Sequence, residues 1–146
     1  MHKILIVEDH ADVRKLLRMT LEFEDYEILE ASDGDHGLAM ALQHAPDVVL
    51  LDVMMPGIMN GLAVCRSIKN ERSLRRTKVV MLTARGQSAD RQAGFAAGAD
   101  DYLVKPFSTL QVLETLRRVE ALPEGARLPG LPSGNRPVAL PSGAAR

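Results

Sequence analysis

Five side chains that can take part in metal or phosphate chemistry stand where short apolar runs of the chain come to an end. Glu8 and Asp9 follow the first run, Asp52 ends another, and Thr83 and Lys105 follow two more. A carboxylate at the end of a buried strand can be a nucleophile, a metal ligand or a helix cap. The rest of the sequence must decide among these three roles.

The run at 48–51 is the clearest of these segments. Four apolar residues, two of them β-branched, lead into Asp52, and Pro56-Gly57 interrupts the chain shortly afterwards. Short apolar runs bounded by turn signals are typical of strands that are buried on both faces of a sheet. The sequence therefore predicts a central strand that ends at Asp52.

Strands and helices are predicted to alternate five times. The expected strands are 4–7, 26–31, 48–51, 79–82 and 102–104. The expected helices are one at 13–21, one between an Asp33 cap and Pro46, one containing 62–68, one from Ser88 to near Gly98, and one opened by a capping box at 108–111. Helices of about ten residues can serve as crossovers between parallel strands.

The predicted fold is α/β, with a doubly wound parallel sheet of five strands. Right-handed crossovers and the polarity of the strands favour the flavodoxin-like order 2-1-3-4-5, in a (βα)5 arrangement. The most uniformly apolar strands are expected in the centre. The more polar strands at 26–31 and 102–104 are expected at the edges.

This topology would bring the five reactive side chains together. Doubly wound sheets bind ligands beyond the carboxyl ends of their strands, at the point where the winding reverses. Glu8, Asp9 and Asp52 would meet there, and Thr83 and Lys105 would close the pocket. Neighbouring carboxylates repel one another unless a cation offsets their charge, and ligands that are all oxygen favour Mg²⁺ over a softer metal.

Phosphoryl transfer is the chemistry that this set of groups would support. An ionised carboxylate can attack a phosphoryl donor, and the reaction depends mainly on positioning and on charge stabilisation. The metal would bind one phosphoryl oxygen, the Thr83 hydroxyl would donate to a second, and the Lys105 ammonium would pair with a third.

Five segments in this order resemble the receiver domain of response regulators, the CheY-like family of bacterial two-component signalling. They are the acidic pair 8–9, the segment 51–56, Thr83-Ala84, the segment 98–102 and the segment 105–107. Each is a weak signal alone, but together they form a specific signature. The resemblance covers residues 3 to about 121.

The resemblance implies that Asp52 is the phosphoacceptor. It also implies that Mg²⁺ is held by Asp9, Asp52 and the main-chain carbonyl of Met54, with Glu8 acting partly through water. A Lys105-Pro106 peptide bond in the cis form is implied as well, and cis bonds are largely confined to proline.

The function implied is a phosphorylation switch in the cytoplasm, not an enzyme. A histidine kinase or phosphotransfer protein would supply the phosphoryl group, and a downstream protein would be the target. The new charge would draw in Thr83 and Lys105, and Tyr102 resembles the family's switch aromatic. The face formed by the fourth helix, the last strand and the last helix would then change, and could also join two copies in a homodimer.

Two features depart from the family pattern or tune it. Gly61 lies nine positions after Asp52, one more than is usual in the family. The loop over the site is therefore expected to differ in shape from the usual one. The positions two after the acceptor and two after Thr83 are Met54 and Arg85, and neither is a side chain that positions water. We therefore expect slow loss of the phosphoryl group.

Other interpretations remain open at this level. A receiver-like module could bind proteins without phosphorylation. A haloacid-dehalogenase-like phosphatase also uses an Asp after a strand, but it needs a second Asp two residues on, where this chain has Met54. Asp52 or Thr83 could be a cap and Lys105 a surface lysine. His10 follows the acidic pair and could touch a ligand, but it is expected to be a solvated loop residue.

Composition narrows the class of protein. With 146 residues and 46% hydrophobic content, the chain suits one domain, expected at 1–122. The 18 basic and 19 acidic residues give no electrostatic footprint for nucleic acid or membrane. The single cysteine fits a reducing cytosol. Prolines and glycines are frequent in 123–146, which predicts a disordered tail or a linker to an output domain.

Overall fold

The computed structural model describes residues 2–55, 57, 59–84 and 88–122. Arg85, Pro56 and the tail predicted at 123–146 lie outside the described residues. Five parallel strands form one sheet in the order β2-β1-β3-β4-β5. The predicted α/β fold, with its doubly wound five-stranded sheet and its strand order, is therefore confirmed.

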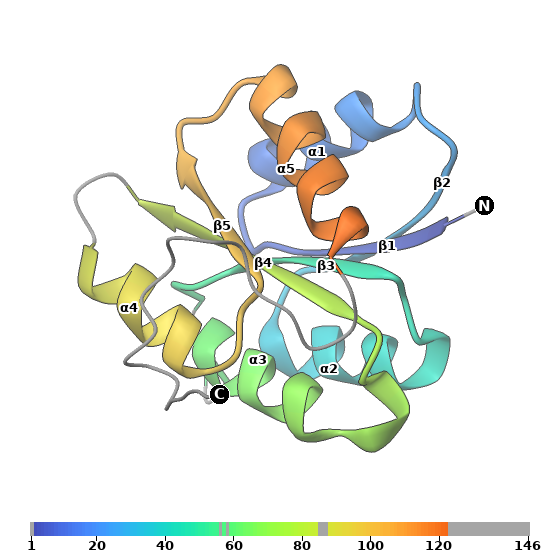
Figure 1. Ribbon diagram of the computed structural model, residues 1–146. Helices are drawn as coiled ribbons and strands as arrows, with labels where there is room; N and C mark the ends of the chain where they lie inside the picture. Colours follow the sequence, from blue (N-terminus) through green and yellow to red (C-terminus); the bar gives the residue numbers. More distant parts are fainter. Residues whose placement is uncertain (1, 56, 58, 85–87, 123–146) are drawn as a thin grey trace.

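The elements alternate as predicted (Figure 1). The strands are β1 (His2–Val7), β2 (Tyr26–Ala31), β3 (Val48–Asp52), β4 (Lys78–Ala84) and β5 (Asp101–Lys105). The helices are α1 (Ala11–Leu21), α2 (Gly34–His44), α3 (Gly61–Asn70), the short 3₁₀ helix η1 (Arg72–Leu74), α4 (Ser88–Ala96) and α5 (Thr109–Ala121).

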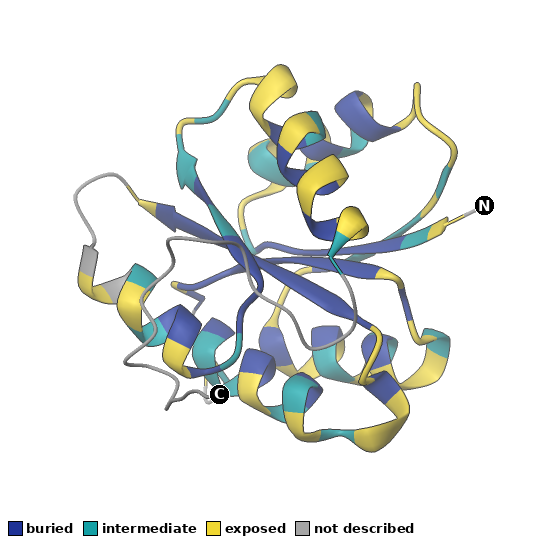
Figure 2. Cartoon of the chain, viewed as in Figure 1, coloured by how far each residue is buried: buried dark blue, intermediate teal, exposed yellow. Residues whose placement is uncertain are grey.

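The sheet is the middle of three layers. Helices α1 and α5 cover one face and α2, α3 and α4 cover the other (Figure 1). Successive residues of a strand point to opposite faces, so Ile4 and Ile6 pack on the α1–α5 side while Leu5 and Val7 pack on the other. Figure 2 shows the central strands buried along most of their length. Two apolar cores thus hold the strand ends in fixed positions.

Some strands extend beyond the apolar runs from which they were predicted. β1 begins at His2, where it pairs with Tyr26, and β5 continues to Lys105, which pairs with Ala84. Backbone hydrogen bonds between strands do not require apolar side chains, so the hydrophobic pattern underestimates strand length. As a result Lys105 is a member of the sheet itself.

Side-chain caps fix where several helices begin. The Asp33 side chain accepts the backbone N–H of His36 at 2.7 Å, which confirms the predicted cap of α2. The predicted capping box of α5 is also present between Ser108 and Gln111. Among the described residues, no helix combines the length and apolar character needed to cross a bilayer.

Candidate functional site

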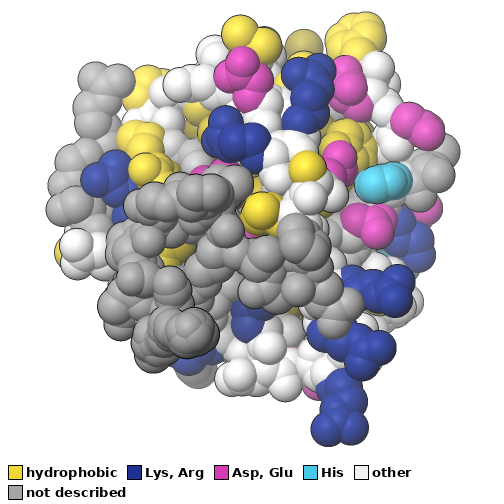
Figure 3. All heavy atoms as spheres, viewed as in Figure 1, with side chains coloured by type: hydrophobic (Ala, Val, Ile, Leu, Met, Phe, Trp, Pro, Cys, Tyr) yellow, Lys and Arg dark blue, Asp and Glu magenta, His cyan; other side chains and the backbone are white. Residues whose placement is uncertain are grey.

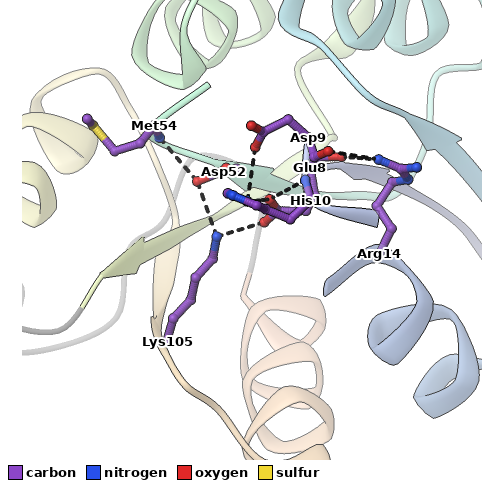
Figure 4. A network of polar contacts seen from close by, with 7 residues as sticks. All are labelled: Glu8, Asp9, His10, Arg14, Asp52, Met54 and Lys105. Atoms are coloured by element: carbon purple, nitrogen blue, oxygen red, sulfur yellow. Dashed lines mark hydrogen bonds and ion pairs between the residues drawn. The ribbon is translucent and has the colours of Figure 1, made fainter. Parts of the chain in front are cut away.

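The acids come together because β1 and β3 are neighbours in the sheet. Val7 of β1 lies opposite Leu51 of β3, so the next residues, Glu8 and Asp52, leave the sheet side by side. Figure 4 shows Glu8, Asp9 and Asp52 converging at this edge. β1 (His2–Val7) and β3 (Val48–Asp52) are far apart in the sequence, and the crossover topology is what brings their carboxyl ends together.

The carboxyl groups form a compact cluster with His10. One ligand atom from each of Glu8, Asp9, His10 and Asp52 can be chosen so that all four lie within 4.8 Å of one another. Glu8 is fully buried and Asp52 is 3% exposed. The Oδ2 atom of Asp52 is buried and has no hydrogen-bond partner among the described residues. A hard divalent cation fits such a cluster, since it would ligate the unpaired oxygen and offset the clustered charge.

Lys105 reaches the same cluster from the end of β5. Its Nζ lies 2.8 Å from Glu8 Oε1 and 3.5 Å from Asp52 Oδ1 (Figure 4). Burial alone would lower the pKa of Lys105, but contacts with Glu8 and Asp52 outweigh it and raise the pKa. The side chain is therefore a permanent cation, and its charge partly offsets the acids.

The two aspartates titrate as a pair. Burial, together with the neighbouring Asp9 and Glu8, raises the pKa of Asp52 to about 7 in the metal-free protein. Burial also acts to raise the pKa of Asp9, but hydrogen bonding with Asp52 and Glu8 outweighs it and lowers that pKa. As the pH falls, Asp52 therefore takes up a proton before Asp9 does. A bound cation would favour the ionised form of Asp52.

Thr83 lies beside Asp52 on the neighbouring strand. Asp52 pairs with Leu82, and Thr83 is the next residue of β4. The residue is 1% exposed, and within the described part of the chain its Oγ1 has no hydrogen-bond partner. A buried hydroxyl without a partner is costly, so it favours a ligand that accepts a hydrogen bond there.

The chain after Asp52 is held close to the acid. The backbone N–H of Met54 donates to Asp52 Oδ1 at 3.1 Å, and the Met54 side chain is 66% exposed and points away from the acids. Gly61, the first residue of α3, packs against the Asp52 backbone, and a Cβ there would overlap the Asp52 carbonyl oxygen. This close approach explains why a glycine is needed where the loop ends and α3 begins.

Two supporting residues were not identified from the sequence. Arg14 of α1 donates from Nη1 to the carbonyl oxygens of Glu8 (2.8 Å) and Asp9 (3.4 Å), and its Nε lies 3.6 Å from Glu30. It thereby fixes the backbone that carries both acids. Helical side chains point back toward the N-terminus of their helix, which was the available signal for Arg14. The second residue, His10, is exposed, as expected, but its ring also contacts Glu8 and Asp9.

The predicted switch residue Tyr102 lies on β5, beside α4. Its ring packs edge-on against Phe95 with centroids 5.5 Å apart, and the Arg91 guanidinium lies 5.2 Å from the ring centroid. The residue is partly buried. The Lys105-Pro106 bond is cis, as predicted.

Two grooves lie at the opposite end of the sheet, where β3 and β4 begin. The larger has a volume of about 470 Å³ and is lined partly by Arg72, Arg75 and Arg76. Figure 3 shows Lys and Arg side chains gathered at the lower right of the molecule. Neither groove is lined by the acids or by Lys105, so the clustered chemistry belongs to the carboxyl end of the sheet.

Residues 4–117 match the family of response regulator receiver domains. The transcriptional regulatory protein ResD of Bacillus subtilis is 50% identical over 120 residues, which are 82% of this chain and 47% of ResD. The chain thus spans about half the length of the curated relatives it matches.

Solved structures show the same fold. The chemotaxis response regulator CheY4 of Vibrio cholerae has a TM-score of 0.76 at 36% identity, over 82% of this chain and 98% of that one. The receiver domain of a sensor histidine kinase from Pseudomonas aeruginosa, solved with a magnesium ion in its active site cleft, has a TM-score of 0.75 at 28% identity, with the same coverage of both chains.

Proposed function

Because the chain belongs to the response regulator receiver domain family, we propose that it is a phosphorylation switch in which Asp52 is the phosphoacceptor. The observation that carries this proposal is the buried Asp52 carboxylate, which has one oxygen without a hydrogen-bond partner among the described residues and lies 3.5 Å from the Lys105 ammonium. A histidine kinase or a phosphotransfer protein would be the donor.

Mg²⁺ is the cofactor that the oxygen ligands favour. Asp9, Asp52 and the main-chain carbonyl of Met54 would hold it, with Glu8 acting partly through water. When bound, the ion would offset the clustered negative charge and stabilise charge on the transferred phosphoryl group. The magnesium ion in the related Pseudomonas receiver domain supports this assignment.

The transfer step requires an ionised Asp52. One carboxylate oxygen of Asp52 attacks phosphorus in phosphohistidine, the P–N bond breaks, and the electron pair remains on the donor imidazole, which is then protonated from solvent. The product is an acyl phosphate on Asp52. Lys105 and Thr83 would hold two of the phosphoryl oxygens, the first by charge and the second by donating a hydrogen bond.

The new phosphoryl group would act as a switch through these two residues. Drawing in Thr83 would move the end of β4, and Tyr102 on the adjacent strand packs against α4 through Phe95 and Arg91. We propose that the face formed by α4, β5 and α5 is the element whose two states are biased. A downstream protein, or a second copy of the chain, would bind this face.

The chain would act as a signalling protein in the cytoplasm and not as an enzyme that turns over a substrate. Relatives named as transcriptional regulators support a role upstream of gene regulation. The near balance of acidic and basic residues favours protein partners over direct contact with nucleic acid or membrane.

Intact-mass spectrometry after incubation with a small phosphodonor tests the proposal. The wild-type protein should gain one phosphoryl group with Mg²⁺ and none in chelator. Asp52→Asn should gain none, while the control Asp25→Asn, an exposed loop acid, should behave like the wild type. Equal labelling of Asp52→Asn and wild type would contradict the assignment. Continuous release of phosphate from a phosphate ester would instead indicate a phosphatase.

A further inference from the structure

The acidic cluster contains a nitrogen atom as well as oxygens. Nδ1 of His10 lies 3.0 Å from Glu8 Oε2 and 3.3 Å from Asp9 Oδ1. It belongs to the same group of potential ligand atoms as Asp52, all within 4.8 Å of one another. Figure 4 shows the His10 ring turned toward the acids. The sequence-based argument for Mg²⁺ counted oxygen ligands only, and the structure adds an imidazole to them.

The local backbone holds the ring in this position. The backbone N–H of His10 donates to Glu8 Oε2 at 3.1 Å, and Glu8 is itself fixed by Lys105. His10 is the residue that precedes α1, yet its side chain makes no capping hydrogen bond to the helix. The imidazole is therefore not engaged as a helix cap, and it faces the acids instead.

The separations match those of atoms that share one metal ion. With metal–ligand bonds of about 2.0–2.1 Å, neighbouring ligands of a tetrahedral site lie about 3.3–3.4 Å apart, and those of an octahedral site about 2.9 Å. In this metal-free structure the 3.0 Å contact between His10 Nδ1 and Glu8 Oε2 is a hydrogen bond, and both distances from Nδ1 to the carboxylate oxygens also have this size. An independent feature also indicates a ligand here, since the buried Asp52 Oδ2 has no hydrogen-bond partner among the described residues.

We propose that His10 is a metal ligand that extends the selectivity of this site from Mg²⁺ to borderline divalent ions such as Co²⁺, Ni²⁺ and Zn²⁺. Imidazole nitrogen is a preferred ligand for these ions, whereas Mg²⁺ takes oxygen. Mg²⁺ binds through the carboxylates alone, and a borderline ion gains a bond to His10 Nδ1. The inference rests on the proposed function only in treating the acidic cluster as a metal site.

Metal affinities of the untagged wild-type protein and of two variants test this inference. Isothermal titration calorimetry with Co²⁺ and with Mg²⁺ compares the wild type, His10→Gln and His36→Gln. Gln retains hydrogen-bonding capacity toward Glu8 but lacks the ring nitrogen, and His36 is an exposed histidine on α2. His10→Gln should lower Co²⁺ affinity by more than about tenfold, because even outer-shell partners of metal sites contribute about 10–100-fold. Its Mg²⁺ affinity should stay unchanged, which also shows that the variant is folded.

A spectroscopic measurement distinguishes ligation from orientation of Glu8. The proton NMR spectrum of the Co²⁺-loaded protein should contain strongly shifted imidazole resonances that disappear in His10→Gln and persist in His36→Gln. Parallel losses of Co²⁺ and Mg²⁺ affinity, or the absence of those resonances, would overturn the inference and assign His10 only to positioning Glu8. If Asp52 is still phosphorylated with Mg²⁺ in that case, the proposed function stands without it.

Discussion

Replacing Asp52 with Asn should stabilise the metal-free protein at pH 8. The wild-type acid sits in a buried cluster beside two other acids, which raises its pKa from 3.8 to about 7. Ionising it in the folded state is therefore unfavourable. Asn removes the charge but keeps an oxygen that can accept the Met54 N–H, now 3.1 Å from Asp52 Oδ1.

The size of the effect follows from linkage between proton binding and folding. A pKa that rises from 3.8 to about 7 corresponds to about 4 kcal/mol at high pH. Hydrogen bonding with Asp52 lowers the pKa of Asp9, so part of that penalty is returned within the pair of aspartates. We expect a net stabilisation of about 2 kcal/mol in Asp52→Asn.

The stabilisation by Asp52→Asn should depend on pH, because it comes from removing an ionisable group. An acid whose pKa is raised by folding binds more protons in the folded state, so its contribution to stability falls as pH rises and levels off above the folded pKa. The difference in unfolding free energy between Asp52→Asn and wild type should therefore grow from pH 4 to about 7 and then remain constant.

Urea denaturation in chelator across this pH range measures the difference. Asp25→Asn, an exposed loop substitution, provides the control and should follow the wild type. Adding Mg²⁺ should then stabilise the wild type more than Asp52→Asn, since a ligand stabilises the state that binds it. A metal-free Asp52→Asn that is less stable than wild type at pH 8 would refute the electrostatic account of this site.

Three further substitutions test other parts of the site. Lys105→Met should destabilise the protein by about 3 kcal/mol in urea denaturation, because it leaves the buried Glu8 carboxylate without its 2.8 Å partner; an unchanged midpoint would contradict that pairing. Gly61→Ala should cost about 1–3 kcal/mol and weaken phosphorylation, because its Cβ meets backbone, whereas the control Gly94→Ala meets a flexible methionine side chain at 3.2 Å and should cost less. Thr83→Val should still accept the phosphoryl group but lose the accompanying NMR shifts in the α4–β5–α5 face, and retention of those shifts would exclude its role in the switch.

The fold and the meeting of the acids followed from the sequence because they depend on patterns that act locally. Apolar runs identify strands, and caps such as Asp33 identify where helices begin. Right-handed crossovers then restrict the strand order, and the order places Glu8 beside Asp52. Each step uses the residue types and their spacing, and none requires a side-chain conformation.

The supporting residues could not be predicted in the same way, because their roles depend on side-chain direction. Arg14 reaches the carbonyl oxygens of residues five and six positions before it, and its sequence position alone suggests only an exposed helix residue. The ring of His10 could face solvent or the acids, and the difference is a rotation within one side chain. Gly61 is needed because α3 approaches the Asp52 carbonyl, a distance set by the packed loop.

The most direct test of the central claim is to locate the phosphoryl group within the chain. After incubation with Mg²⁺ and a small phosphodonor, borohydride reduction converts an aspartyl phosphate into homoserine, and peptide mass spectrometry identifies the position. The account predicts homoserine at position 52 alone, in samples that contained Mg²⁺. Homoserine at another acid such as Asp9, or phosphate on a histidine with Asp52 unmodified, would contradict it.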